Sequence, residues 1–254
     1  MAADRPGALV ARDDKATADK ETAMVERTTI TTKDGSFSAY VARPQRSPAP
    51  AVVVIQEIFG VNQVMRDITD GLAAQGYLAI CPDLFWRIEP GIDITDHSDA
   101  EWKRAFELFN AFDVEAGVGD IAATLDHIRK DAGCNGKVGA VGYCLGGQLA
   151  FLTATRTDSD ASVSYYGVGL ENRVAEAEKL THPLLVHIAE EDEFVPKPAQ
   201  AVILAALKDH PQVEVHTYPG CNHAFAREGG AHYNPEAAKL ANGRTLTFFQ
   251  KNLG

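Results

Sequence analysis

The chain has 254 residues, which is enough for one substantial hydrophobic core, although length alone would also allow two domains. Its formal net charge of −11 argues against nucleic acid or an anionic membrane surface as a partner, and no Lys/Arg-rich run contradicts this. The N-terminus lacks the apolar core of a signal peptide, and the four cysteines show no paired spacing. We therefore expect a globular protein of the reducing cytoplasm, without metal.

The first part of the chain divides at about residue 25. Residues 1–24 mix Ala, Asp, Lys, Arg and Thr with little apolar content, which is typical of a flexible N-terminal extension. Two alternating runs of β-branched or aromatic residues then follow, at 25–32 and 36–42, around Asp34-Gly35. They predict a β-hairpin.

From residue 51 onward, strand patterns alternate with helical patterns. Short apolar runs typical of buried strands lie at residues 51–55, 77–81, 137–142, 161–166, 183–189 and 213–218. Apolar residues at helical spacing lie at residues 62–75, 99–111, 114–131, 148–155, 197–208 and 235–251. This alternation predicts an α/β protein with a doubly wound, mostly parallel sheet and the hairpin at one antiparallel edge. Because no linker or repeat divides residues 25–254, we expect them to form one domain, with the aromatic loop 84–98 covering a site.

The stretch Gly142-Tyr-Cys-Leu-Gly146 joins a strand pattern to a helix pattern. A G-x-nucleophile-x-G sequence in this context is the nucleophile elbow of the α/β-hydrolase fold, here with Cys144 in place of Ser. Glycines suit the turn because side chains at those positions would collide with it, and the helix N-terminus favours a thiolate. On these five residues alone, a buried structural cysteine in a Gly-rich turn is the alternative.

Two later loops supply the partners that such a nucleophile needs. Asp192 follows the strand pattern 183–189 and His223 follows 213–218, so nucleophile, acid and histidine come in the order of a hydrolase triad. His223 would take the Cys144 proton or hold the thiolate as an ion pair, and Asp192 would orient the imidazole. Taken singly, Asp192 could belong to a solvated acidic loop, and His223 is one of eight histidines.

The loop after strand 51–55 is the second place of interest. The fold puts its second oxyanion-hole amide there, so the hole would consist of the N–H groups of Leu145 and Ile58. Glu57 in this loop needs a partner or a raised pKa, unless it is an ordinary solvated carboxylate. Arg87 and Arg227 lie in loops at the same sheet edge and suggest a substrate carboxylate, surface arginines being the alternative.

Four segments together resemble the dienelactone hydrolase family (carboxymethylenebutenolidases), and the match covers nearly the whole chain from about residue 26. They are Gln56-Glu-Ile-Phe-Gly60, Cys81-Pro-Asp-Leu-Phe-Trp-Arg87, Gly142-Tyr-Cys-Leu-Gly-Gly147 and Gly220-Cys-Asn-His-Ala-Phe-Ala-Arg227. They are similar to the family patterns Q-E-x-[FW]-G, C-P-D-L-[YF]-x-R, G-[YF]-C-x-G-G and G-x-x-H-x-F-x-R. Four such segments in the right order are far more specific than any one of them.

The resemblance implies a site and a reaction. It implies the triad Cys144–His223–Asp192 and a carboxylate, Glu57, that contacts the resting thiol and turns on substrate binding to help generate the thiolate. It also implies carboxylate binding by the two arginines, and it makes Phe59, Tyr143 and Trp86 further candidates for substrate contact. The implied reaction is the hydrolysis of an enol-lactone, dienelactone to maleylacetate, through a thioester, without a cofactor.

The sequence also departs from the family pattern. Ala224 follows the catalytic histidine where well-known bacterial members tend to have Ser, and Phe85-Trp86 makes one arginine's loop bulkier. Two alternatives to a lactone hydrolase are a broad-specificity carboxylesterase or thioesterase with the same triad, and a non-catalytic ligand-binding or thiol redox-sensing protein. In each case we expect a small-molecule ligand and a monomer or small homo-oligomer.

Overall fold

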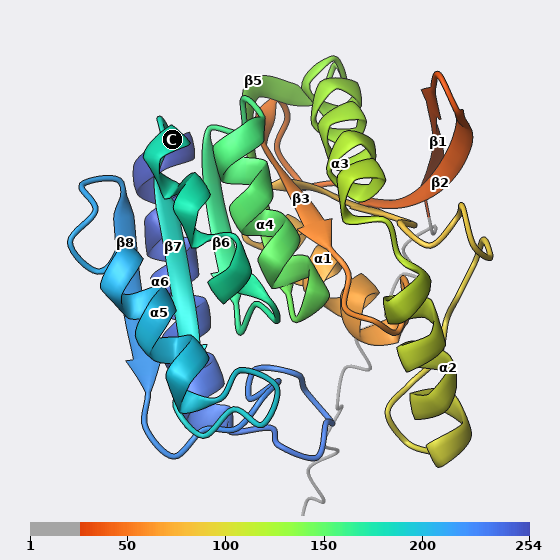
Figure 1. Ribbon diagram of the computed structural model, residues 1–254. Coiled ribbons are helices and arrows are strands. Elements are labelled where there is room, and N and C mark those ends of the chain that lie inside the picture. Colours follow the sequence, from red (N-terminus) through yellow and green to blue (C-terminus); the bar gives the residue numbers. More distant parts are fainter. Residues whose placement is uncertain (1–25) are drawn as a thin grey trace, which may run out of the picture.

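The computed structural model describes residues 26–254 of the chain (Figure 1). The extension expected over residues 1–24 lies outside this range. Within it, one sheet holds eight strands in the spatial order β1-β2-β4-β3-β5-β6-β7-β8. Their bounds are β1 (Glu26–Thr32), β2 (Gly35–Ala42), β3 (Ala49–Ile55), β4 (Leu78–Pro82), β5 (Cys134–Tyr143), β6 (Ala161–Tyr165), β7 (Leu184–Ala189) and β8 (Val213–Tyr218).

The sheet is antiparallel at one edge and parallel elsewhere. β1 and β2 form the predicted hairpin, with Thr32 opposite Gly35, and β2 pairs antiparallel with β4. All other neighbouring strands run parallel. The predicted α/β-hydrolase architecture is therefore confirmed.

Helices cover both faces of this sheet (Figure 1). One face carries α1 (Gln63–Ala74) and α6 (Pro235–Leu253), and the other carries α3 (Val114–Arg129), α4 (Leu145–Arg156) and α5 (Lys197–Leu207). Because both faces are covered, β3 is wholly apolar and its residues from Ala51 to Ile55 have no exposed surface. Two short 3₁₀ helices that the sequence patterns did not predict, η1 (Leu170–Asn172) and η2 (Val174–Lys179), lie between β6 and β7.

The remaining helix, α2 (Asp99–Ala111), stands apart from the sheet near the carboxyl ends of the strands (Figure 1). Its N-terminus is capped by the Ser98 hydroxyl, which accepts a hydrogen bond from the Glu101 amide. The segment between β4 and α2 is the aromatic loop of the sequence. It brings α2 over the loops that follow β3, β5, β7 and β8.

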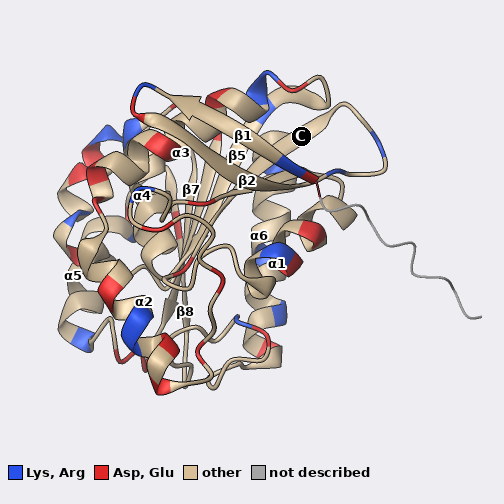
Figure 2. Cartoon of the chain, turned by 90° about the vertical axis from the view of Figure 1, so that its right-hand side faces the viewer, with Lys and Arg blue, Asp and Glu red and all other residues tan. Residues whose placement is uncertain are grey.

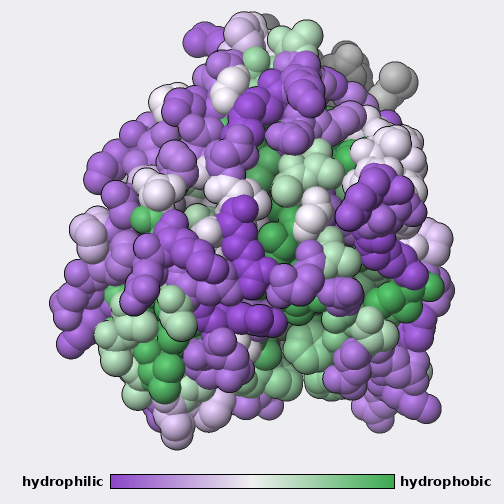
Figure 3. Space-filling view, turned by 45° about the horizontal axis from the view of Figure 1, so that its top comes forward, coloured by the Kyte–Doolittle hydropathy of each residue, from purple (hydrophilic) through white to green (hydrophobic). Residues whose placement is uncertain are grey.

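The surface shows no separation of charge or hydrophobicity on the faces in view. Acidic and basic residues are interspersed along the helices in Figure 2. Hydrophilic residues cover most of the face in Figure 3, with small apolar areas between them. Between residues 26 and 254, the helices are all too short or too polar to cross a lipid bilayer.

Candidate active site

Cys144 lies at a sharp turn between β5 and α4. Its backbone has φ 57° and ψ −116°, a region that residues with a side chain rarely adopt. A Cβ at Gly142 would overlap the carbonyl oxygen of Gly146, and one at Gly146 would overlap that of Ile55. The glycines on either side of Cys144 are therefore required by the close approach of backbone atoms, and the turn places the buried cysteine at the carboxyl edge of the sheet.

Asp192 and His223 form a buried ion pair at the same edge. The distance from His223 Nδ1 to Asp192 Oδ2 is 2.9 Å, and that to Oδ1 is 3.1 Å. The same Oδ1 atom accepts hydrogen bonds from the amides of Phe194 and Val195, at 2.9 and 3.1 Å. The turn after β7 therefore fixes the carboxylate, and the carboxylate fixes the imidazole ring.

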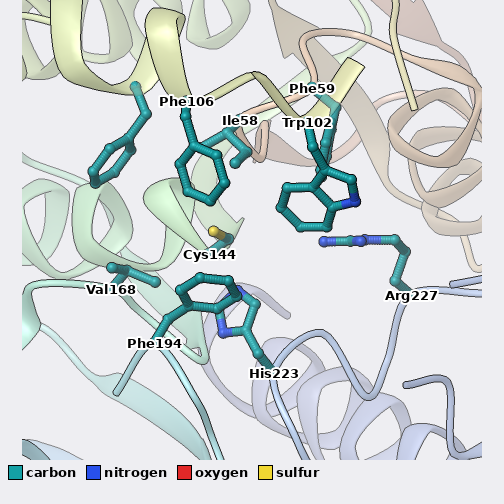
Figure 4. A pocket seen from close by; sticks show the side chains of 10 residues that line it. Ile58, Phe59, Trp102, Phe106, Cys144, Val168, Phe194, His223 and Arg227 are labelled. Carbon is teal, nitrogen blue, oxygen red and sulfur yellow. The ribbon is translucent and has the colours of Figure 1, made fainter. Parts of the chain in front are cut away.

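The other nitrogen of the imidazole faces the cysteine pocket. His223 Nε2 is buried and has no hydrogen-bond partner among residues 26–254, and His223 lines the same pocket as Cys144 (Figure 4). Burial opposes a charged imidazole, but the negative charge of Cys144 and the hydrogen bond to Asp192 outweigh it and raise the pKa of His223 to about 10. A thiolate at Cys144 and an imidazolium at His223 would stabilise each other.

Backbone amides suited to an oxyanion lie beside Cys144. Ile58 lines the pocket, and Leu145 is the first residue of α4, where a helix has amides without an intrahelical partner. Among the hydrogen bonds within residues 26–254, none is donated by the amide of Ile58 or of Leu145. Both are available to a ligand oxygen.

A buried cluster of charges borders the pocket. Arg227 Nε lies 2.8 Å from Glu57 Oε2, and Arg227 Nη1 lies 2.6 Å from Asp96 Oδ2. Burial opposes the charge of Arg227, but Glu57 outweighs this and raises the pKa of the guanidinium above its ordinary value. The other Glu57 oxygen, Oε1, is buried and has no partner among the described residues, so no hydrogen bond joins Glu57 to Cys144.

Comparison with known proteins agrees with this geometry. Residues 37–253 match the family model described as "Dienelactone hydrolase family". The chain belongs to the dienelactone hydrolase family. It is 57% identical over 232 residues to a "Putative carboxymethylenebutenolidase" of Azospirillum brasilense, covering 87% of this chain and 96% of that relative. It is 44% identical over 226 residues to a "Carboxymethylenebutenolidase" of Pseudomonas putida, covering 89% and 96%.

The solved structures agree as well. A "Putative Dienelactone Hydrolase" from Klebsiella pneumoniae superposes with a TM-score of 0.79 at 29% identity, covering 90% of this chain and 98% of the other. As a member of the dienelactone hydrolase family, the chain is a carboxylic ester hydrolase. This membership is at odds with the non-catalytic alternative.

The pocket of this dienelactone hydrolase family member has aromatic walls that the sequence analysis missed. Trp102, Phe106 and Phe109 of α2 line it, together with Phe194 (Figure 4). The three α2 residues recur at i, i+4 and i+7, so they share one helix face. That spacing was readable in the sequence, but it is equally typical of a helix face that packs into a core.

Several predicted site residues do line the pocket. The structure brings together Cys144, His223, Ile58, Phe59 and Arg227. The ring of Phe59 lies under the Arg227 guanidinium, whose central carbon is 4.9 Å from the ring centre. Asp192 and Glu57 do not line the pocket themselves. Asp192 contacts His223, and Glu57 contacts Arg227.

Arg87 and Trp86, both predicted to contact substrate, lie elsewhere. Arg87 binds Asp120 of α3 through Nε and Nη2, at 3.1 and 2.8 Å, and it also contacts Asp34 at 3.1 Å. Trp86 Nε1 donates to Asp120 as well, at 2.8 Å. The Asp120 carboxylate is almost fully buried, and a buried charge needs such partners. Arg87 and Trp86 therefore do not line the Cys144 pocket, and their contact with substrate stays a prediction.

Tyr143, the third such prediction, also points away from the cysteine pocket. Its ring stacks on Tyr165 with 4.7 Å between ring centres. It borders a separate depression between α1 and α6, on the opposite face of the sheet. Successive side chains of a strand alternate between faces, so a residue adjacent to the nucleophile is not thereby part of its pocket.

Proposed function

We propose that this chain hydrolyses a small, carboxylate-bearing enol-lactone, of the dienelactone to maleylacetate type, through a Cys144–His223–Asp192 triad. One observation carries the proposal. A buried imidazole, oriented by Asp192 on one side, presents an unpartnered Nε2 to the pocket that also holds Cys144. Membership of the dienelactone hydrolase family and the relatives named as carboxymethylenebutenolidases support it.

In the first half of the reaction the Cys144 thiolate attacks the lactone carbonyl carbon. The carbonyl oxygen becomes an oxyanion, which the amides of Ile58 and Leu145 bind. When the tetrahedral intermediate collapses, the ring C–O bond breaks and an enolate leaves, which the His223 imidazolium can protonate. The acyl group stays on sulfur as a thioester. A resonance-stabilised leaving group suits a thiolate, because thiolates displace poor leaving groups slowly.

In the second half a water molecule cleaves the thioester. Neutral His223 takes a proton from the water as its oxygen attacks the thioester carbonyl, and Asp192 stabilises the imidazolium that forms. The same two amides bind the second oxyanion. The C–S bond then breaks, and the Cys144 thiolate and the His223 imidazolium are restored. The new carboxylic acid releases its remaining proton to solvent, and the product leaves as a carboxylate.

Arg227 is the group we assign to the substrate carboxylate. Its guanidinium points into the pocket below the Trp102 ring, opposite Cys144 and His223 (Figure 4). We assign no substrate contact to Arg87, because it pairs with Asp34 and Asp120 outside the pocket. The family resemblance implies that Glu57 contacts the resting thiol and turns on substrate binding, whereas in this structure Glu57 already binds Arg227 and makes no hydrogen bond to Cys144.

The proposal is tested with cis- and trans-dienelactone, followed by absorbance, for wild type, Cys144→Ala and Arg227→Ala. We expect Cys144→Ala to abolish turnover and to yield no acyl adduct in a quenched intact-mass measurement. Arg227→Ala should lower kcat/KM for dienelactone by about 100-fold, since it removes a charge-assisted contact to the substrate. Arg104→Ala is the matched control, because Arg104 lies on α2 and, among residues 26–254, pairs only with Glu89 and Glu107. Dienelactone turnover by Cys144→Ala would refute the triad.

A second candidate is a broad-specificity carboxylesterase that acts on neutral activated esters. The aromatic pocket walls favour it, and so does the pairing of Arg227 with two carboxylates in the structure. p-Nitrophenyl acetate distinguishes the two. If only this ester is cleaved, and Arg227→Ala leaves its kcat/KM unchanged, the esterase is correct and the lactonase is not.

A further inference from the structure

Arg227 faces more negative charge than it can neutralise. The two side chains that bind its guanidinium, Glu57 and Asp96, are both carboxylates. The Arg227 side chain is 7% exposed, and those of Glu57 and Asp96 are 2% and 10% exposed, so solvent screens this cluster little. A substrate anion that approaches Arg227 therefore meets two internal carboxylates already in place.

Two nitrogens of the Arg227 guanidinium already donate hydrogen bonds to carboxylates of the protein. A carboxylate binds arginine most strongly through two adjacent nitrogens. In the structure Nε is used by Glu57 and Nη1 by Asp96, and within residues 26–254 only Nη2 has no carboxylate partner. Because Nη1 carries two N–H groups, a substrate carboxylate bound through Nη1 and Nη2 would share Nη1 with Asp96, whereas one bound through Nε and Nη2 would displace Glu57.

Of the two carboxylates that bind Arg227, Asp96 is the one that borders a cavity open to a ligand. Asp96 lines a second cavity, which shares Trp102, Phe194, His223 and Arg227 with the Cys144 pocket. Among the described residues, Asp96 does not line the Cys144 pocket itself, and Glu57 lines neither cavity. The Asp96 backbone is held in place because Trp102 Nε1 donates to its carbonyl oxygen at 3.0 Å. Trp102 of the aromatic wall thus anchors the backbone of the residue whose carboxylate binds Arg227.

We propose that Asp96 is a specificity-determining residue, which competes with the substrate carboxylate for Nη1 of Arg227 and so weakens the binding of anionic relative to neutral ligands. The inference rests on the proposed function, because that function assigns Arg227 to the substrate. Asp96 takes no part in the bond-breaking steps. Its effect should fall on the affinity for anions and leave the rate of thioester chemistry unchanged.

The test measures anion affinity without requiring that dienelactone be the substrate. Maleate, a small dicarboxylate without an ester, serves as competitive inhibitor of p-nitrophenyl acetate hydrolysis by wild type, Asp96→Asn and Asp96→Ser. Asp93→Asn is the matched control, since Asp93 lies on the same loop and pairs with Arg66 outside the pocket. Maleate binding is also followed by tryptophan fluorescence, because Trp102 contacts Asp96 directly.

We expect both Asp96 variants to bind maleate about tenfold more tightly than wild type, with kcat/KM for the neutral ester within about twofold. Asp93→Asn should match wild type in both measurements. The KM for dienelactone should fall in parallel with the maleate inhibition constant. Two variants of different shape are used so that a folding defect in one, seen by circular dichroism, does not decide the result.

Three outcomes would overturn the inference. Weaker maleate binding in both variants would mean that Asp96 positions Arg227 for the ligand instead of competing with it. Unchanged binding would mean that Asp96 does not compete. Equal fold-changes in maleate affinity and in kcat/KM for the neutral ester would mean that Asp96 has only a structural role. Failure of the proposed function is distinguishable, because it would appear as absent dienelactone turnover by wild type whatever the maleate constants are.

Discussion

Nδ1 of His223 lies 2.9 Å from Oδ2 of Asp192, and both side chains are almost fully buried. This contact joins the loop after β7 to the loop after β8 and holds the imidazole with its other nitrogen toward Cys144. A buried histidine without a counter-charge would lose its proton easily. Here the negative charge of Cys144 and Asp192 outweighs burial and raises the pKa of His223. We therefore expect the stability of the protein to depend on pH.

The first prediction concerns stability against pH. The pKa of His223 is raised to about 10, above the ordinary value of 6.5, because burial is outweighed by Cys144 and Asp192. Its contribution to the free energy of unfolding is therefore fully present below pH 6.5 and is lost as the pH rises through about 10. The difference in unfolding free energy between wild type and His223→Gln should shrink by a few kcal/mol across this window. A pH-independent difference in urea titrations would contradict it.

The second prediction concerns the elbow glycines. Gly146→Ala should destabilise the protein by at least about 2 kcal/mol, because its Cβ would overlap the carbonyl oxygen of Ile55 in the neighbouring strand. Gly243→Ala in α6 is the matched control. A Cβ there has no atom within 4 Å, so alanine should stabilise the helix by up to about 1 kcal/mol. Thermal unfolding of both variants checks the sign, and a neutral Gly146→Ala would mean that the turn can relax.

The third prediction separates the two arginines. Arg87→Gln should cost about 2 to 4 kcal/mol of stability, because it leaves Asp120 buried with only the Trp86 N–H as partner among these three side chains. Its KM for dienelactone should stay within about twofold of wild type. Denaturant titration and steady-state kinetics on the same preparation test both statements. A selective loss of dienelactone affinity at unchanged stability would return Arg87 to the active site.

The fourth prediction concerns the aromatic wall. Phe106 is 41% exposed yet lines the pocket beside Trp102 and Phe194, with ring centres 5.6 and 6.3 Å away. Phe106→Ala should therefore cost no more than about 1 kcal/mol of stability while raising the KM for an aryl ester several-fold. Leu240→Ala, at a residue of α6 that is 51% exposed, is the control and should change neither quantity. Equal KM values for wild type and Phe106→Ala would show that the substrate does not reach this wall.

Sequence patterns alone predicted those parts of the site whose geometry depends on residues close together in the chain. Strand and helix periodicity predicted the order of the elements, and the glycines around Cys144 predicted the elbow, because backbone overlap leaves no room for a side chain there. Asp192 and His223 could be found from their positions just after strands. In a parallel sheet such loops meet at one edge.

Contacts between residues far apart in the chain were decided only by the tertiary structure. Arg87 pairs with Asp120 of α3, 33 residues away, and Arg227 with Asp96, 131 residues away. A charged side chain is drawn to whichever opposite charge packing buries beside it, and sequence position does not reveal that partner. The same holds for α2, whose aromatic stripe could have faced a core. Its packing over Cys144 makes that stripe the wall of the pocket.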